Sequence, residues 1–265
     1  MNAPLLEIRG LQKRFGAVTA TDGVDLSVAT GETLALIGPN GAGKTTLINQ
    51  MAGALHPDWG RIFFDGRDIT RTPTHRRALM GIARTFQITN IFNGFSVLEN
   101  VALAVQARSG HSFRFWRDAR RIPALTDPAM AVLEELGMSA KAHVPAGRLS
   151  HGEQRQIGIA MALAARPRIL LLDEPTAGMG RRETAGMIRL LEQLKGRHAM
   201  LLVEHDMDVV FTLADRISVL VYGRCIATGS SLEIQGNPLV RDAYLGDDWC
   251  RVNVPNGTDG GADHA

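Results

Sequence analysis

The stretch at residues 38–45 constrains the fold of this chain more than any other part of the sequence. It fits the pattern G-x-x-x-x-G-K-[ST] in full. The glycines let the backbone turn its N–H groups inward around phosphate groups. Lys44 can reach the outer phosphates, and the hydroxyl of Thr45 can ligate Mg²⁺. The motif consists of Gly38, Pro39, Asn40, Gly41, Ala42, Gly43, Lys44 and Thr45.

The flanking sequence supports a phosphate loop. A continuously apolar run, residues 33–37, comes before the motif, and a helix-like run, residues 46–52, follows it. A phosphate loop requires this order of strand, loop and helix. The helix would also present the positive end of its dipole to the bound anion. A chance glycine-rich turn is the alternative, and it does not explain the flanking pattern.

The composition is that of an ordinary globular protein. Of 265 residues, 45% are hydrophobic and 21% are charged, and the net charge is +2 at pH 7. So small a net charge gives no argument for nucleic acid as a partner. The two cysteines, Cys225 and Cys250, lie far apart, which favours a reducing compartment. We expect neither a signal peptide nor a membrane span, so a membrane role would come through partners.

Short apolar segments predict a mixed α/β fold. Segments within residues 6–28 alternate in the way that is typical of half-buried antiparallel strands. Continuously apolar runs favour strands that are buried on both faces. These runs are residues 33–37, 169–172 and 199–203, with a further strand at residues 217–221. Residues 97–165 read as helical, so we expect an α/β sheet that carries an inserted helical subdomain.

Asp173 and Glu174 follow directly on one of these buried strands. An open α/β sheet places its ligand site at the carboxyl ends of its strands. Asp173 is suited to hold Mg²⁺, usually through water, and Glu174 is placed to orient or deprotonate an attacking water. A helix N-cap is the alternative for this pair, but the complete phosphate loop favours the catalytic interpretation.

The last helix of the middle region has a well-marked start. Ser150 and Glu153 stand three residues apart, as a capping box requires, and Pro167 lies just beyond the helix. The surrounding residues, Leu-Ser-His-Gly-Glu-Gln at 149–154, resemble the signature motif of ATP-binding cassette ATPases. The resemblance implies that Ser150 and the backbone of Gly152, with Glu153, contact the γ-phosphate of an ATP held by another subunit. A helix cap alone is the alternative, and both roles can hold.

Further residues match the same family. Phe15 occupies the aromatic position that stacks on adenine in the family, although core packing would also explain it. Gln87 matches the glutamine that contacts Mg²⁺ or water, and His205 matches the histidine that hydrogen-bonds the γ-phosphate. The resemblance also assigns Thr46 to the nucleotide site. His151 and Glu153 depart from the family's commonest signature, Leu-Ser-Gly-Gly-Gln, which puts the strength of ATP-driven dimerisation in question.

The resemblance covers residues 6–247 and predicts a P-loop NTPase (RecA-like) core sheet with an N-terminal antiparallel β subdomain and an inserted α-helical subdomain. We expect one nucleotide-binding domain, residues 1–250. Its core is 1–87 and 166–250, its helical subdomain is 88–165, and residues 251–265 form a disordered tail.

Several wordings narrow the resemblance to the ATP-binding subunits of branched-chain amino acid importers. They are Arg-Thr-Phe-Gln at 84–87, Ala-Gly-Met at 177–179, Glu-His-Asp-Met at 204–207 and Ala-Tyr-Leu-Gly at 243–246. The implied cofactors are ATP and Mg²⁺. The implied partners are a second ATPase subunit, two integral membrane permease subunits and, indirectly, an extracytoplasmic solute-binding protein, with no nucleic acid. The implied location is the cytoplasmic face of the inner or plasma membrane.

Three alternatives stay open at this point. The same ATPase could drive an exporter, or it could be a soluble cassette protein of translation or DNA repair. A P-loop kinase or GTPase would lack the signature helix. Residues 108–121 combine arginines with aromatic residues, which is typical of a solvated edge or of a surface near lipid headgroups. Phe92 lies where the family's docking groove accepts a short helix of a membrane subunit.

Overall fold

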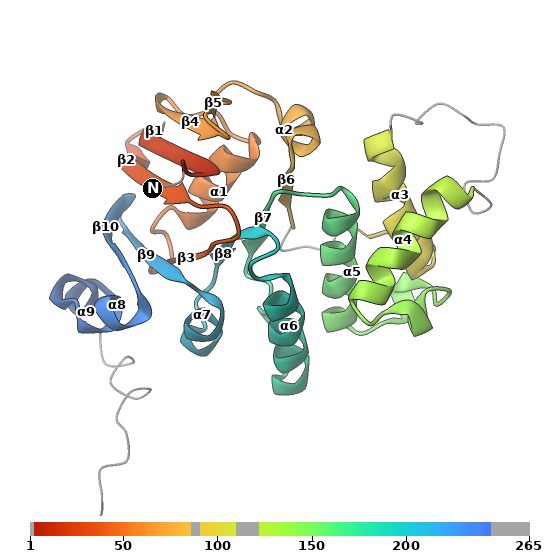
Figure 1. The fold of residues 1–265 in the computed structure, drawn as a ribbon. Helices are drawn as coiled ribbons and strands as arrows, with labels where there is room; N and C mark the ends of the chain where they lie inside the picture. The colour runs from red at the N-terminus through yellow and green to blue at the C-terminus, as the bar shows by residue number, and fades with distance from the viewer. Residues whose placement is uncertain (1–2, 86–90, 110–121, 245–265) are drawn as a thin grey trace, which may run out of the picture.

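The computed structural model describes residues 3–85, 91–109 and 122–244, and its elements fall into two sheets and two groups of helices (Figure 1). The N-terminal sheet is antiparallel, with strand order β2-β1-β4-β5. Its strands are β1 (Leu6–Phe15), β2 (Val18–Val28), β4 (Trp59–Phe64) and β5 (Arg67–Asp68). The alternation predicted for residues 6–28 is confirmed, because Leu6 and Ile8 are buried while Arg9 is exposed.

The second sheet has the strand order β10-β9-β3-β8-β7-β6. Neighbouring strands are parallel except for the antiparallel edge strand β10. Its strands are β3 (Thr33–Ile37), β6 (Ile82–Arg84), β7 (Ile169–Asp173), β8 (Ala199–Val203), β9 (Arg216–Val221) and β10 (Arg224–Gly229). Every residue of β3, β7 and β8 is buried, which confirms the strands predicted from continuously apolar runs.

Helices cover both faces of this sheet. The residues of α1 pack with the antiparallel sheet in one hydrophobic cluster, and α6 and α7 pack against the other face with β7 and β8 (Figure 1). The C-terminal helices α8 and α9 lie next to β10. The bounds are α1 (Lys44–Ala52), α2 (Thr74–Met80), α6 (Arg181–Leu194), α7 (Met207–Leu213), α8 (Ser231–Gly236) and α9 (Pro238–Tyr244).

The middle of the chain is helical, as predicted, and stands to one side of the parallel sheet (Figure 1). It has its own hydrophobic cluster, in which Val101, Leu133 and Ile157 are fully buried. Its elements are α3 (Val97–Ser109), α4 (Pro123–Glu135), the short 3₁₀ helices η2 (Ser139–Lys141) and η3 (Ala146–Arg148), and α5 (His151–Ala164). This cluster is distinct from those of the two sheets, and Ile159 and Leu163 of α5 join the helical group to β7.

Arg77 anchors the end of α1 that lies away from the phosphate loop. Its side chain is fully buried and donates to the carbonyl oxygens of Gln50 (2.8 Å) and Met51 (2.7 Å) in α1. A cation at a helix C-terminus offsets the negative end of the helix dipole. Burial lowers the pKa of Arg77 to about 10, so its guanidinium is charged at neutral pH. This contact fixes the helix whose other end forms the phosphate loop.

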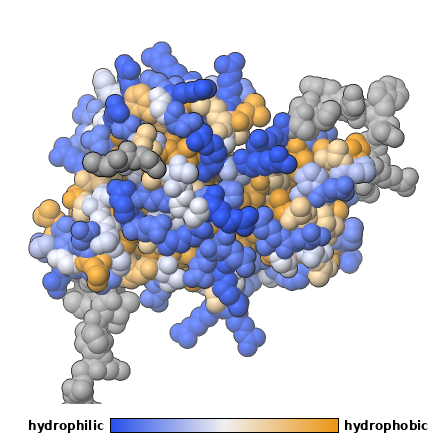
Figure 2. Space-filling model, in the orientation of Figure 1, coloured by the Kyte–Doolittle hydropathy of each residue, from blue (hydrophilic) through white to orange (hydrophobic). Residues whose placement is uncertain are grey.

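The face shown in Figure 2 is largely hydrophilic, with apolar side chains scattered over it. Phe92 and Phe95, before α3, are exposed, and their rings stack with centroids 5.3 Å apart. Within the described residues, no helix combines the length and the apolar character that crossing a membrane requires.

Candidate active site

The phosphate-loop motif follows β3 directly and ends in the first turn of α1. Gly41 and Gly43 have φ angles of 80° and 103°, a region that favours glycine. A Cβ atom on Gly43 would lie 2.1 Å from the carbonyl oxygen of Ala20, so no larger residue fits there. Gly38 is confined in the same way, because its Cβ would lie 2.0 Å from the carbonyl oxygen of Leu220. Close packing against the carbonyl oxygens of Ala20 and Leu220 therefore requires glycine at both positions.

Lys44 is folded into its own loop. Its Nζ donates to the carbonyl oxygens of Gly38 (2.5 Å) and Pro39 (3.0 Å), and the residue is buried. Burial lowers the pKa of Lys44, and the nearby carboxylates of Glu174 and Asp173 oppose that shift. The ammonium group therefore lies close enough to the acidic pair to interact with it electrostatically. Thr45 is exposed in the first turn of α1.

The parallel strand order brings the predicted catalytic residues to one edge of the sheet. β8 lies between β3 and β7, and Val203 at its end pairs with Leu36 of β3 and with Asp173 of β7. The residues after these strands therefore emerge together. They are the phosphate loop after β3, Glu174 after β7 and His205 after β8. This confirms that the acidic pair lies at a strand end, where an open α/β sheet places its ligand site.

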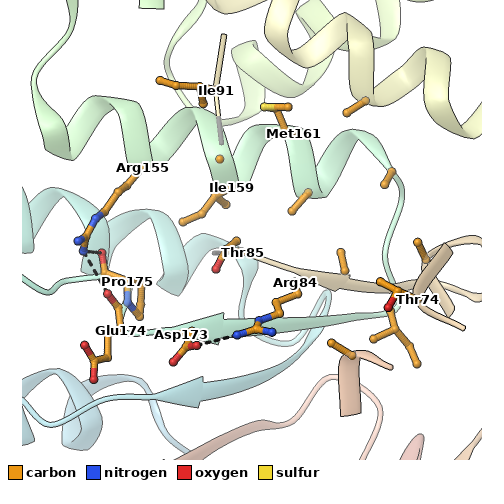
Figure 3. A pocket seen from close by; sticks show the side chains of 18 of the residues that line it. Thr74, Arg84, Thr85, Ile91, Arg155, Ile159, Met161, Asp173, Glu174 and Pro175 are labelled. Carbon is orange, nitrogen blue, oxygen red and sulfur yellow. Dashed lines mark hydrogen bonds and ion pairs between the residues drawn. The ribbon is translucent and has the colours of Figure 1, made fainter. Parts of the chain in front are cut away.

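Asp173 is buried and ion-paired. Its Oδ2 accepts a hydrogen bond from Nη2 of Arg84 at 3.0 Å, which Figure 3 shows as a dashed line. The same guanidinium donates through Nη1 to Oδ1 of Asn49 in α1. Arg84 ends β6, the strand beside β7. In the sequence, Arg84 stands out only as part of the Arg-Thr-Phe-Gln segment at 84–87, which does not indicate this contact.

Glu174 has a strained backbone. Its φ angle is 48°, which a residue with a side chain rarely adopts. Its N–H donates to the carbonyl oxygen of Val203 (2.9 Å), and its own carbonyl accepts from Nη1 of Arg155 (3.1 Å). Arg155 belongs to α5 and also donates to the carbonyl oxygen of Pro175 (3.1 Å; Figure 3). Helix α5 thus holds the turn that carries Glu174 in place.

A cavity of about 340 Å³ lies between α5 and the strands β6 and β7 (Figure 3). Its walls are largely apolar, with Ile159 and Met161 on the α5 side. Arg84, Asp173 and Glu174 lie on the sheet side. The helical group therefore faces the acidic pair across this cavity, while Ile159 and Leu163 of α5 pack with β7.

Glu204 is a buried carboxylate whose structural role the sequence did not reveal. It is fully buried and accepts hydrogen bonds from the backbone N–H (3.0 Å) and Oγ1 (2.6 Å) of Thr176. Its Oε2 also accepts from the N–H of His205 at 3.2 Å. Glu204 thereby ties the loop of the exposed His205 to the turn after Glu174. A carboxylate directly after a buried strand was the available signal.

Ser150 begins α5 with the predicted capping box. Its Oγ accepts from the N–H of Glu153 (3.3 Å), and its N–H donates to Oε2 of Glu153 (2.9 Å). A hydrogen bond from Lys141, then one from the N–H of Ser150, lowers the pKa of Glu153. Gly152 packs against α6, because a Cβ there would lie 2.9 Å from Oε1 of Glu183.

Of the remaining predicted residues, the structure describes Phe15 but not Gln87. Phe15, at the end of β1, is 52% exposed, so core packing does not account for it, and Nζ of Lys13 lies 5.7 Å from its ring centroid. Gln87, residues 110–121 and the tail at 251–265 lie outside the described residues.

The oxygen donors at the end of the sheet fit Mg²⁺. The Thr45 hydroxyl and the Asp173 carboxylate are the hard oxygen ligands that this ion takes together with substrate phosphates. The described residues hold no cluster of three His, Cys, Asp or Glu that would favour another metal.

Comparison with known proteins decides the family. Residues 21–177 match the sequence model of the family described as "ABC transporter". The chain belongs to the ABC transporter family. Residues 224–249 match a second model, described as "Branched-chain amino acid ATP-binding cassette transporter". The chain is the ATP-hydrolysing motor subunit of an ABC transporter.

Two kinds of relative cover the chain almost completely. The high-affinity branched-chain amino acid transport ATP-binding protein BraF of Pseudomonas aeruginosa is 38% identical, over 93% of this chain and 100% of its own. The ADP conformation of MJ1267, an ATP-binding cassette of an ABC transporter, is similar with a TM-score of 0.82 and 30% identity, over 93% of this chain and 100% of the other. A dimeric post-hydrolysis state of the cassette MJ0796, bound to ADP and Pi, is similar with a TM-score of 0.70 and 25% identity, over 85% of this chain and 98% of the other.

Proposed function

We propose that this ABC ATPase drives an importer of branched-chain amino acids or related small solutes. The strand order β3-β8-β7 carries the catalytic part of the proposal, because it gathers the phosphate loop, the acidic pair and His205 at one sheet edge. The transport role rests on the similarity to BraF along its whole length. The C-terminal match at residues 224–249 supports the same cargo class.

The phosphate loop binds the nucleotide in this proposal. The backbone N–H groups of residues 38–46 surround the phosphates, and Lys44 exchanges its loop carbonyl partners for phosphate oxygens. Phe15 stacks on the adenine. Thr45 and Asp173, with Gln87, would hold Mg²⁺, which when bound would offset the negative charge of the nucleotide's phosphates.

Glu174 and His205 perform the hydrolysis. The carboxylate of Glu174 orients the attacking water and accepts its proton, and the strained turn held by Arg155 fixes the direction of that carboxylate. His205 donates a hydrogen bond to the γ-phosphate. Glu204 positions the His205 loop through its backbone, so the histidine ring stays available to the nucleotide.

The complete site needs a second ATPase subunit. The hydroxyl of Ser150 and the backbone of Gly152 and Glu153 would contact the γ-phosphate held by the phosphate loop of the partner, and the dimeric cassette MJ0796 supports this arrangement. An isolated monomer is therefore a poor ATPase. ATP drives transport by favouring the closed dimer over the open one. The partner is a second cassette subunit, either another copy of this chain or a different ATPase chain.

The membrane partners are two permease subunits. The ATPase lies on the cytoplasmic side of these permeases. An extracytoplasmic solute-binding protein delivers the solute to them. The core at 1–87 and 166–250 carries the nucleotide, and the helical subdomain at 88–165 contacts the permeases. The exposed, stacked pair Phe92 and Phe95 offers an apolar surface to a short permease helix. Phe92→Asp would then prevent assembly with the permeases.

Glu174→Gln tests the catalytic assignment. The change keeps the size of the side chain and removes its basicity, so hydrolysis should fall about 10²–10⁴-fold while ATP binding persists. Turnover is measured by phosphate release and affinity by filter binding. Glu192→Gln, on the exposed face of α6, serves as the control and should leave both unchanged. Near-normal turnover of Glu174→Gln would refute the general-base role.

Capture from native membranes tests the transport assignment. Tagged Glu174→Gln protein is purified in mild detergent with Mg-ATP, and its companions are identified. Two multi-span proteins and a second cassette ATPase would support the importer, and the recovered permeases would allow uptake assays with branched-chain amino acids. Recovery of this chain alone, or with soluble proteins only, would contradict the importer and favour a soluble cassette protein.

A further inference from the structure

Arg84 joins two parts of the active site that lie far apart in sequence. Its Nη2 donates to Oδ2 of Asp173 at 3.0 Å, and its Nη1 donates to Oδ1 of Asn49. The side chains of Arg84 and Asp173 are only 12% and 7% exposed. A charge-assisted hydrogen bond with so little contact to water is stronger and better oriented than a surface ion pair.

The position of the guanidinium is itself fixed. Arg84 pairs with Leu171 across β6 and β7, and the N–H of the next residue, Thr85, donates to the carbonyl oxygen of Leu171 at 3.0 Å. The strand that supplies the donor is thus in register with the strand that supplies the acceptor. Because both strands are held in place, the hydrogen bond from Arg84 restricts the side-chain torsions of Asp173.

This contact leaves one carboxylate oxygen for a ligand. Among the described residues, the hydrogen bond from Arg84 goes to Oδ2, and the other oxygen points away from the guanidinium (Figure 3). An aspartate that binds a metal through one oxygen is commonly oriented by a hydrogen bond to the other. The second arm, to Asn49, ties the same guanidinium to α1, whose N-terminus forms the phosphate loop.

We propose that Arg84 is a positioning residue that orients the metal-binding carboxylate of Asp173 and holds it in register with the phosphate-loop helix. The inference rests on the proposed role of Asp173 toward Mg²⁺. It assigns to the end of β6 a part in metal binding, in addition to its position before Gln87. The positive charge of Arg84 would by itself repel Mg²⁺, so removing that charge would strengthen metal binding if charge alone mattered. Weaker metal binding after its removal would instead indicate that Arg84 orients Asp173.

Arg84→Met tests the proposal in the full-length protein. Binding of a fluorescent ATP analogue is titrated with Mg²⁺, and binding of Mn²⁺ to the nucleotide complex is followed by electron paramagnetic resonance. Loss of the orienting bond should raise the metal concentration at half-saturation about 10–100-fold. Affinity for the analogue in EDTA should stay unchanged. Arg84→Lys, which keeps the charge and a single donor nitrogen, should restore part of the metal affinity.

Two further variants complete the experiment. Asn49→Leu removes only the second arm and should shift the metal dependence in the same direction by a smaller factor, and it decides the matter if Arg84→Met does not fold. Arg168→Met is the matched control, because it removes a bidentate pair with Asp65 just before the opposite end of β7. It should leave the metal dependence unchanged.

The outcomes separate the inference from the proposed function. Unchanged or tighter metal binding in Arg84→Met and Asn49→Leu would overturn the positioning role, because charge repulsion or mere packing would then describe Arg84. Nucleotide binding by the unmodified protein that shows no dependence on Mg²⁺ or Mn²⁺ would instead overturn the proposed role of Asp173.

Discussion

Two helix N-termini in this molecule have opposite designs. The N-cap residue of α1 is Gly43, which offers no side-chain cap, and the first turn carries the cation Lys44 and no acidic residue. The N-cap residue of α5 is Ser150, whose capping box is complete, and the first turn carries the acidic Glu153. A cation at the positive end of a helix dipole is unfavourable, and an acid there is favourable. The terminus of α1 is therefore incomplete without an anion, whereas that of α5 is complete by itself.

The difference suggests that the two helix termini have different roles in nucleotide binding. The α1 terminus gains a capping anion, a partner for Lys44 and a balanced dipole when phosphate binds, so it can bind nucleotide alone. The α5 terminus gains only what the hydroxyl of Ser150 and the surrounding amides can add to a γ-phosphate presented from outside. We expect it to contribute only in a dimer, which agrees with the proposed need for a second subunit.

Lys44→Ala should show the largest effect on this comparison. Charge-assisted hydrogen bonds to phosphate contribute about 1.5–3 kcal/mol, so ATP affinity should fall by about one to two orders of magnitude. The nucleotide-free protein should keep its melting temperature within about 2–4 °C, because the change also removes a cation from the helix N-terminus. Filter binding and calorimetry measure the two quantities. Lys195→Ala, which breaks the ion pair with Asp215, is the control and should leave affinity unchanged.

Unchanged ATP affinity in Lys44→Ala would contradict this contrast between α1 and α5, because nucleotide binding at the α1 terminus would then not depend on the charge of Lys44.

Ser150→Ala should have an intermediate effect of a different kind. Loss of the cap should destabilise the protein by about 1 kcal/mol, while ATP affinity of the monomer stays unchanged and ATPase activity at high protein concentration falls. Ser230→Ala is the matched control, because Ser230 caps α8 with Glu233 in the same way. It should lose similar stability and keep its ATPase activity. Equal activities of the two variants would reduce Ser150 to a helix cap.

Glu153→Gln should show the smallest effect, and the effect should depend on pH. The pKa of Glu153 is lowered from 4.5 in the folded protein, so the charged side chain stabilises the fold above that pH. This contribution is lost as pH falls through the folded pKa. The melting temperature of the variant should be lower than that of the unmodified protein at neutral pH, and the difference should shrink as the pH falls below 4.5. A difference that persists in acid would assign the stabilisation to packing.

Much of the fold could be predicted from local pattern. The buried runs at 33–37 and 199–203 coincide with β3 and β8, because a strand buried on both faces must be apolar throughout. The capping box of Ser150 is equally local and was equally predictable. Contacts between elements were not, and Arg77 is the clearest case, because nothing near it in sequence indicates that its guanidinium caps another helix.

The sequence by itself determined the chemistry that this protein carries. A complete phosphate loop, an acidic pair after a buried strand and a capped signature helix are each encoded within a few residues, because each depends on backbone conformation and short-range hydrogen bonds. Only the tertiary structure decided how these parts are held. The strand order that gathers them, the guanidinium of Arg84 between Asp173 and Asn49, and the hold of Arg155 on the Glu174 turn join residues far apart in the chain. Such contacts arise from packing of whole elements, which no local pattern records.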